Sequence, residues 1–314
     1  MSTELFDLLD LTHWEPPRLI RDPTDLDKPV PPLPHAHAVR RAWDVLGLCG
    51  VVYIDRYPAV YLKEVEAVSA ELAREWHRKL WNHGVAPVLV VAAREKVHVY
   101  SAWALPADGA GKPDSQNRLV DTFDRTAQAL ELEQLVHSLD TGHFYAKYAR
   151  HFDREEAVDR QLLDLLEASR ELLTKGPGEL PGPDADALLI RTIFVCYLIA
   201  REVICGAHFP KRSPLFTIDK AMGLQGLLCG REPGEAEDLL FDLFRRLKRR
   251  FKGSLFDTDL DAERQRITQR HMTALQGFLR GDDPREGGQR ALGFPAYDFS
   301  MIPVETISAI YEKF

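Results

Sequence analysis

Six cationic side chains fall within eight consecutive residues of the last third of the sequence, a density that could bind phosphate groups. They are Arg245, Arg246, Lys248, Arg249, Arg250 and Lys252. Each cation that neutralises a DNA phosphate releases a counterion, so such a run would give an affinity that falls with salt. The alternative is a solvated helix end, where cations complement the negative partial charge. A helix end needs one or two cations rather than six. Both interpretations, contact with DNA or RNA and a solvated helix end, therefore remain possible.

A carboxylate and a lysine, Asp55 and Lys63, lie in neighbouring β-prone runs and could serve Mg²⁺-dependent cleavage of a phosphodiester. In that chemistry two acids bind the metal and the lysine polarises the attacking water. The second acid should stand two residues before the lysine, because only alternate residues of a strand share a face, and Tyr61 occupies that position. Glu64 points to the other face and Glu66 lies on the wrong side of the lysine. The sequence therefore favours a scaffold without nuclease activity, in which Lys63 is solvated and Asp55 closes a turn.

The remaining candidates for chemistry are weak. The pair His35 and His37 has no carboxylate or cysteine close by in sequence, so a metal site is not expected there. Trp81 stands between apolar neighbours, which favours a core position over a base-stacking platform. The cysteines are widely spaced, with no Cys-x-x-Cys pair, and this argues against a disulfide framework or a zinc ribbon; they are Cys49, Cys196, Cys205 and Cys229.

The elements that must position these residues begin with a small α/β domain. Residues 1–38 are rich in proline, which predicts an extended lead-in. Residues 39–105 then show β-branched and aromatic runs around one amphipathic helix. The expected elements, in chain order, are a short helix through Arg40, Trp43 and Leu46, strands over 51–55 and 59–65, a helix over 68–83 before Gly84, and strands over 85–92 and 96–100. This strand order resembles the restriction-endonuclease-like fold.

The rest of the chain, residues 118–314, has helical periodicity and follows a Gly-, Asp- and Pro-rich loop. The segment 185–205 is apolar on nearly every face, which predicts the central buried helix of a bundle. The last helix should begin at Pro303, with Glu305 in its first turn. Its apolar stripe is Val304, Ile307, Tyr311 and Phe314, and because the sequence stops with this stripe unfinished we expect a fragment whose last helix packs on further protein. The predicted fold class is α+β.

Three segments together resemble the region upstream of the catalytic domain in type IIG-like and related stand-alone N6-adenine DNA methyltransferases. They are residues 80–91 with 97–101, residues 188–201, and the stretch from 243–256 to 297–314. In that family, a helix similar to Ile302-Pro-Val-Glu-Thr-Ile-Ser-Ala-Ile-Tyr-Glu312 leads straight into the S-adenosylmethionine-binding domain. The matches cover most of residues 45–314. One departure is Lys252-Gly-Ser254, where relatives carry an Asn-Gly-Asp-like turn.

The resemblance implies a non-catalytic, DNA-engaging portion of a restriction-modification or phage-defence protein. Its partners would be double-stranded DNA and a methyltransferase domain, either in cis or as a second chain, and S-adenosylmethionine would bind only to that domain. The sequence itself has neither the Gly-rich cofactor loop nor the Asn-Pro-Pro-Tyr/Phe motif that holds a flipped adenine. Two alternatives remain: a Mg²⁺-dependent nuclease with a variant site at Asp55 and Lys63, and a protein-interaction module that does not bind DNA.

Composition sets the outer limits. The chain has 314 residues, 45% of them hydrophobic and 28% charged, with a net charge of −8. An acidic chain is not a dedicated nucleic-acid coating protein, although a local basic face on an acidic body can still bind DNA. The N-terminus lacks the pattern of a secretion signal, and the sequence has no run of about 18 apolar residues. We therefore expect a cytoplasmic protein without a membrane partner.

Overall fold

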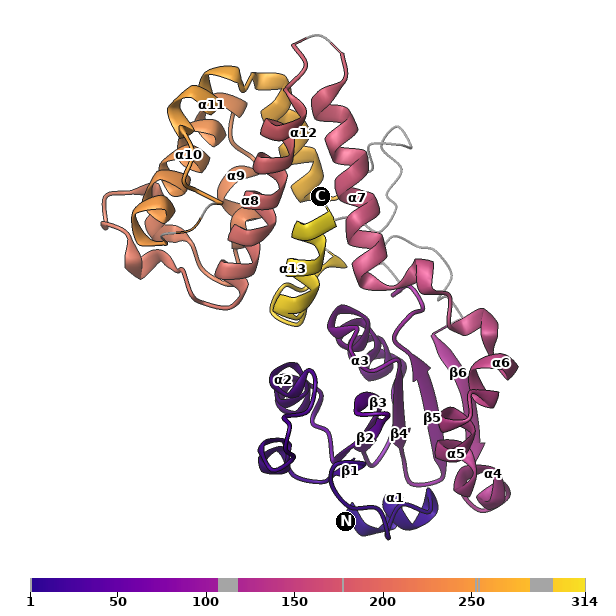
Figure 1. Cartoon of the computed structure of the whole chain (residues 1–314). Helices are drawn as coiled ribbons and strands as arrows, with labels where there is room; N and C mark the ends of the chain where they lie inside the picture. The colour runs from indigo at the N-terminus through magenta and orange to yellow at the C-terminus, as the bar shows by residue number, and fades with distance from the viewer. Residues whose placement is uncertain are drawn as a thin grey trace. The chain divides into compact units, whose positions relative to one another are not determined.

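The computed structural model describes residues 2–106, 118–176, 178–251, 253, 255–282 and 296–313. Over these residues the fold is α+β, with a six-stranded sheet and many helices (Figure 1). The chain forms two compact units. Unit 1 comprises residues 1–161 and 301–303, and unit 2 comprises residues 162–300 and 304–314.

The sheet of unit 1 keeps its strands in sequence order. All neighbouring strands are antiparallel except β3 and β4, which are parallel because helix α3 connects them. The strands are β1 (Leu19–Ile20), β2 (Gly50–Ile54), β3 (Tyr57–Glu64), β4 (Val88–Ala92), β5 (Lys96–Ser101) and β6 (Leu119–Asp124). Helix α3 (Ala70–His83) begins at the side-chain cap of Ser69 and ends at Gly84, whose φ of 63° is the left-handed cap expected from sequence. The predicted strand pairs and this helix are confirmed.

Strand β6 corrects the prediction that everything after residue 118 is helical. It pairs with β5 in the sheet, with Phe123 opposite Val97. Only Val120 and Phe123 of its residues are buried, so the strand carries little of the period-two signal that identifies a half-buried strand. The helices after it, α4 (Ala129–Glu133), α5 (Leu135–Asp140) and α6 (His143–Lys147), pack against the sheet, and unit 1 accordingly extends to residue 161.

The N-terminal lead-in is also more ordered than its prolines predict. It contains helix α1 (Ser2–Leu8), strand β1 and a 3₁₀ turn, η1 (Pro23–Asp27). Leu5, Leu9 and Leu11 are buried in the core of the sheet, and the free energy of burying them explains why this segment is not a surface-running extension. Helix α2 (Ala36–Leu46) follows where a short helix was predicted.

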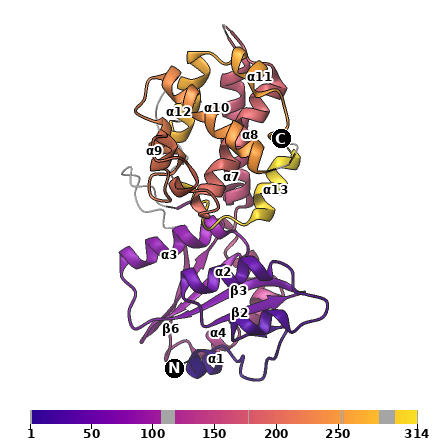
Figure 2. The same cartoon turned by 90° about the vertical axis from the view of Figure 1, so that its left-hand side faces the viewer.

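Both faces of the sheet are covered, which explains why its central strands are apolar throughout. Val88 and Val90 point to a core shared with α1 and α4 to α6. Their alternates Leu89 and Val91 point to a core shared with α2 and α3, the helices that lie over the sheet in Figure 2. Trp81 is fully buried, as predicted, and its Nε1–H donates to the carbonyl oxygen of Glu156 at 2.8 Å.

Unit 2 is built from helices. They are α7 (Val158–Thr174), which begins in unit 1, then α8 (Gly182–Ala200), α9 (Gly223–Leu228), α10 (Pro233–Arg250), α11 (Leu260–Arg266), α12 (Gln269–Arg280) and α13 (Val304–Lys313), with two 3₁₀ turns, η4 (Gly206–His208) and η5 (Pro214–Thr217). Helix α8 is buried on most of its surface, which confirms the prediction of a central helix. Among the described helices, none is long and apolar enough to cross a membrane.

Helix α13 has Glu305 in its first turn, as predicted, but a different apolar face is sheltered. Ile307 and Ile310 are buried by this chain alone, whereas Val304 and Tyr311 remain 47% and 50% exposed. Phe314 lies outside the described residues. The expectation that the whole stripe needs further protein is therefore wrong for Ile307. Residues three apart on a helix share a face, and Ile307 and Ile310 are buried together on the side that lines a groove with α8.

A buried histidine of unit 1 makes the stability of the fold depend on pH. The ring of His77 is almost inaccessible, and its Nε2–H donates to the carbonyl oxygen of Ser101 at 3.0 Å. Burial, helped by the nearby charge of Arg118, lowers the pKa of His77 from 6.5 to about 3. The unfolded chain therefore binds a proton that the folded chain does not, and the stabilisation is complete above about pH 6.5 and is lost as the pH falls towards 3.

We predict that the free energy of unfolding falls by up to ~1.4 kcal/mol per pH unit below about pH 6 through this one residue. His77→Gln keeps a donor and removes the titration, so its stability profile between about pH 7 and pH 5 should be flatter than that of the wild type. Denaturant unfolding at several pH values measures the difference, with the exposed His137→Gln as the control. Parallel profiles for wild type and His77→Gln would contradict the assignment.

Candidate nucleic-acid interface

Five of the six cations of the basic run, Arg245, Arg246, Lys248, Arg249 and Arg250, lie in the last two turns of helix α10. The helix starts at Pro233 and has one apolar face, on which Leu240, Leu243 and Leu247 are buried. The cations occupy the other faces, and Lys248, Arg249 and Arg250 are exposed in the last turn. The prediction that these cations lie at the end of a helix is therefore confirmed.

Three of the five described cations are paired within the chain. Arg245 binds Asp261, with Nη2 2.7 Å from Oδ1, and Arg246 binds Asp242, with Nε 3.0 Å from Oδ2. Lys248 donates to the carbonyl oxygen of Thr258 at 2.7 Å, and its ammonium group is also 3.7 Å from a carboxylate oxygen of Asp257. Lys252 lies outside the described residues. A cation that is already paired with a carboxylate gains little free energy when it exchanges that partner for a phosphate.

Arg249 and Arg250 differ from their neighbours. Within the part of the chain that the structure describes, neither has a carboxylate partner, and Arg250 lies only over the ring of Phe251, 5.7 Å from its centroid. The loop after α8 carries two further exposed cations, Lys211 and Arg212. They follow Phe209 in the chain, and Phe209 lines a hollow together with both arginines. We call these groups the basic surface: His208, Lys211, Arg212, Arg249 and Arg250.

Two hollows flank the end of α10. The larger, about 630 Å³, is lined by Asp242, Arg245, Lys248, Arg249, Asp257, Thr258, Asp259, Leu260 and Asp261. The negative charges of its four aspartates offset the positive charges of its cations, and this balance does not favour an anion. The smaller, about 260 Å³ and here called the arginine pocket, is lined by Ile204, His208, Phe209, Arg246, Leu247, Arg249 and Arg250.

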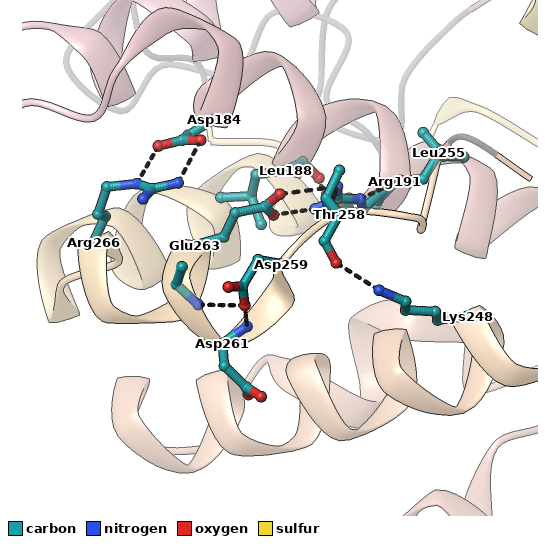
Figure 3. A network of polar contacts seen from close by, with 12 residues as sticks. Asp184, Leu188, Arg191, Lys248, Leu255, Thr258, Asp259, Asp261, Glu263 and Arg266 are labelled. Atoms are coloured by element: carbon teal, nitrogen blue, oxygen red, sulfur yellow. Dashed lines mark hydrogen bonds and ion pairs between the residues drawn. The ribbon is translucent and has the colours of Figure 1, made fainter.

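A buried arginine holds the loop that follows α10 (Figure 3). Arg191, on the central helix α8, is 2% exposed and forms a two-pronged ion pair with Glu263 of α11. Its Nε donates to the carbonyl oxygen of Leu255 at 2.6 Å and its Nη2 to the hydroxyl oxygen of Thr258 at 2.8 Å. Lys248 reaches the same Thr258, so the loop is tied at once to α8, α10 and α11.

The same loop ends in a helix cap. Asp259 accepts hydrogen bonds from the backbone N–H groups of Asp261 and Ala262, at 3.2 and 3.0 Å, and so begins α11. Arg266, at the other end of α11, forms an ion pair with Asp184 of α8. Sequence reasoning missed Arg191, although a signal was present. Arg191 is the one charged residue in the apolar stretch 187–200, and a buried charge must find a partner.

The structure does not bring Asp55 and Lys63 together. Asp55 and Arg56 have φ values of 46° and 68° and form the tight turn between β2 and β3, so the expectation that Asp55 closes a turn is confirmed. Lys63 lies near the opposite end of β3, and six residues at about 3.3 Å each place it ~20 Å from Tyr57. One Mg²⁺ ion cannot contact both. Among the described residues, no group of three or more His, Cys, Asp or Glu side chains could hold a metal ion.

Lys63 has a structural role that corrects the expectation of a solvated side chain. Its ammonium group donates to the carbonyl oxygens of Leu46 and Gly47, at 2.5 and 3.3 Å, and lies 5.2 Å from the ring centroid of Trp76. Burial lowers its pKa. The cation therefore caps the C-terminal end of α2, where carbonyl groups lack helical partners.

Comparison with known proteins gives no further guide: no protein-family model, no curated protein and no solved structure matches this chain. The site must therefore be interpreted from its own geometry.

Loss of Arg191 should destabilise the protein strongly. We expect Arg191→Leu to lower the free energy of unfolding by about 3 kcal/mol or more, because it leaves the largely buried Glu263 and two loop acceptors without their donor. Arg266→Ala is the matched control. It also removes one arginine–carboxylate pair between α8 and α11, but one whose arginine is 44% exposed, and it should lower the free energy of unfolding much less than Arg191→Leu does. Equal losses for the two variants would contradict the role of burial.

The nuclease alternative has a direct test in a plasmid-cleavage assay with Mg²⁺ or Mn²⁺. We expect Asp55→Ala and Lys63→Met to leave any cleavage unchanged, and Lys63→Met to lower the free energy of unfolding by ~1 kcal/mol because the end of α2 loses its donor. Metal-dependent cleavage that disappears in both variants would restore the nuclease interpretation.

Proposed function

We propose that this chain is a DNA-engaging, non-catalytic part of an N6-adenine methyltransferase or restriction-modification protein, and that unit 2 binds the phosphate backbone of double-stranded DNA. The observation that carries the proposal is the basic surface, on which exposed cations gather without carboxylate partners among the described residues. The other described cations at the end of α10 are paired with aspartates of α10, of the following loop and of α11.

The net charge of −8 does not oppose this proposal. At an ionic strength near 0.1 M, charges more than about 10 Å apart are largely screened from each other. A phosphate at the surface therefore responds mainly to the cations within that radius, and the acidic groups elsewhere contribute little. A local basic face on an acidic body also limits non-specific association at other surfaces.

The proposed methyltransferase partner has a candidate docking place in unit 2. A groove of about 300 Å³ runs between α8 and α13, and its lining is almost wholly apolar, with Ile193, Phe194, Val304 and Tyr311 among its residues. Val304 and Tyr311 are half exposed, and residues 302–312 resemble the helix that leads into the cofactor-binding domain of the family. The catalytic domain would cover this groove and would supply S-adenosylmethionine chemistry, which this chain does not perform by itself.

The rival function is a protein-interaction module, in which the basic surface meets an acidic protein and not DNA. Both functions use the same cations, so the geometry of the surface alone does not separate them. What separates them is the response to salt and to duplex length, because counterion release is a property of the regularly charged DNA backbone.

We predict salt-dependent binding to a duplex of arbitrary sequence, measured by fluorescence anisotropy across a salt series. The double variant Arg249→Ala/Arg250→Ala should reduce the slope of log affinity against log salt by about 1.8, that is, by ~0.9 for each lost phosphate contact. The matched control is Arg245→Ala/Lys248→Ala, which removes the same charge from the same helix but takes it from paired side chains; its slope should change by less than half as much.

Two results would reject DNA binding. One is the absence of any affinity at low salt, and the other is an affinity with no salt dependence. Equal slopes for the two double variants would show that the unpaired arginines are not the phosphate contacts.

A further inference from the structure

The arginine pocket joins an apolar floor to a cationic rim. Ile204, Phe209 and Leu247 form the floor and are buried. The rim consists of His208, Arg246, Arg249 and Arg250, and no carboxylate is among the described residues that line it. This combination favours a small group that is anionic on its outside, since a cation or a neutral apolar group would leave the guanidinium groups unused.

The charge of the pocket remains positive after the one ion pair of its lining residues and the end of the helix are included. Asp242 contacts only Nε of Arg246, and an arginine has four further N–H donors. The C-terminal end of α10 contributes about half a negative charge, which disfavours an anion. Three guanidinium groups outweigh that partial charge and one aspartate. A water molecule occupies about 30 Å³ in the liquid, so a 260 Å³ hollow has room for a group several times larger.

The imidazole of His208 adds a donor of fixed direction. Its Nδ1 accepts a hydrogen bond from the backbone N–H of Cys205, at 3.1 Å. A backbone N–H can only donate, so Nδ1 carries no proton in this contact and the ring proton is on Nε2. The Cys205 Sγ atom, 3.6 Å from the same Nδ1, faces that nitrogen as well. Nε2–H is therefore the one N–H donor of this ring, and His208 lines the pocket.

The loop that carries His208 is held in place before any ligand binds. Gly206 donates its N–H to the carbonyl oxygen of Ile218 at 2.6 Å. A Cβ atom at position 206 would lie 1.8 Å from the carbonyl oxygen of Phe216, so only glycine allows this approach. On the other side, the guanidinium of Arg246 lies 5.9 Å from the ring centroid of Phe209, which ties the loop to α10. A loop that is fixed in this way loses little conformational entropy when a ligand binds.

We infer that the arginine pocket holds one phosphodiester group of the DNA backbone, which accepts from His208 Nε2–H and from the guanidinium groups of the rim. This contact fixes the register of the chain on the duplex, whereas Lys211 and Arg212 add attraction without a defined position. The inference rests on the proposed DNA binding and names the part of the basic surface that selects one phosphate.

The test separates a hydrogen bond from a charge. An imidazole without net charge displaces no counterion, so His208→Ala should weaken duplex binding about tenfold, as expected for a lost hydrogen bond to a charged acceptor, and leave the salt slope unchanged. Arg249→Ala should weaken binding and also lower the slope by about 0.9. His208→Gln, which offers an amide donor near the position of Nε2, should restore most of the affinity. His137→Ala, an exposed histidine of unit 1, is the control and should change neither quantity.

A second measurement follows the histidine itself. In long-range ¹H–¹⁵N spectra of the full chain, the free protein should show His208 protonated at Nε2, and this resonance should move on addition of duplex. Inorganic phosphate at matched ionic strength is the comparison ligand, and it should cause the smaller change because the proposed occupant is a backbone phosphodiester.

The outcomes distinguish the two proposals. If the wild type has no affinity for duplex at low salt, DNA binding fails and the pocket assignment with it. If duplex binding keeps its salt slope and is unaffected by His208→Ala, only the pocket assignment fails. A His208 resonance that responds to inorganic phosphate but not to duplex would identify a site for small anions and overturn the inference.

Discussion

The ion pair between Arg191 and Glu263 is the contact on which the arrangement of unit 2 depends. A guanidinium group that is 2% exposed must have its charge and its donors satisfied, since burying an unpaired charge costs several kcal/mol. Here the satisfied donors reach two loop acceptors as well as the carboxylate. One buried side chain thus sets the distance between α8 and α11 and the path of the chain that leaves α10.

That constraint also decides which cations of α10 are free to meet a ligand. Because the loop is held against α8, Asp257 of the loop lies near Lys248 and Asp261 at the start of α11 meets Arg245. Among the described residues, Arg249 and Arg250 form no ion pair with these aspartates, and both line the arginine pocket with the loop after α8. The basic surface therefore results from the pairing of the neighbouring cations as much as from the presence of arginines.

Unit 1 shows a different balance between local and distant interactions. Helix α3 has a serine cap, a glycine end and a clear apolar stripe, so its local signals and its tertiary position agree. Strand β6 has weak local signals, and it is fixed by pairing with β5 and by the helices that cover it. Lys63 is likewise fixed by distant interactions. Its sequence neighbours suggest a strand residue in solvent, but its ammonium group binds carbonyl groups at the end of helix α2.

The sequence by itself determined the elements whose free energy is mostly local: the β2–β3 and β4–β5 strand pairs, helix α3 with its caps, the buried helix α8, and the concentration of cations at the end of α10. Periodicity and capping report such elements because they act within a few residues. Only the tertiary structure decided that β6 joins the sheet, and that Asp55 lies in the turn before β3 while Lys63 lies near the other end of that strand. It also decided that, among the described residues, Arg245 has a carboxylate partner whereas Arg249 and Arg250 have none. These outcomes depend on strand pairing or on partners 16 or more residues away, as with Asp261 and Arg245. The local sequence pattern does not identify such distant partners.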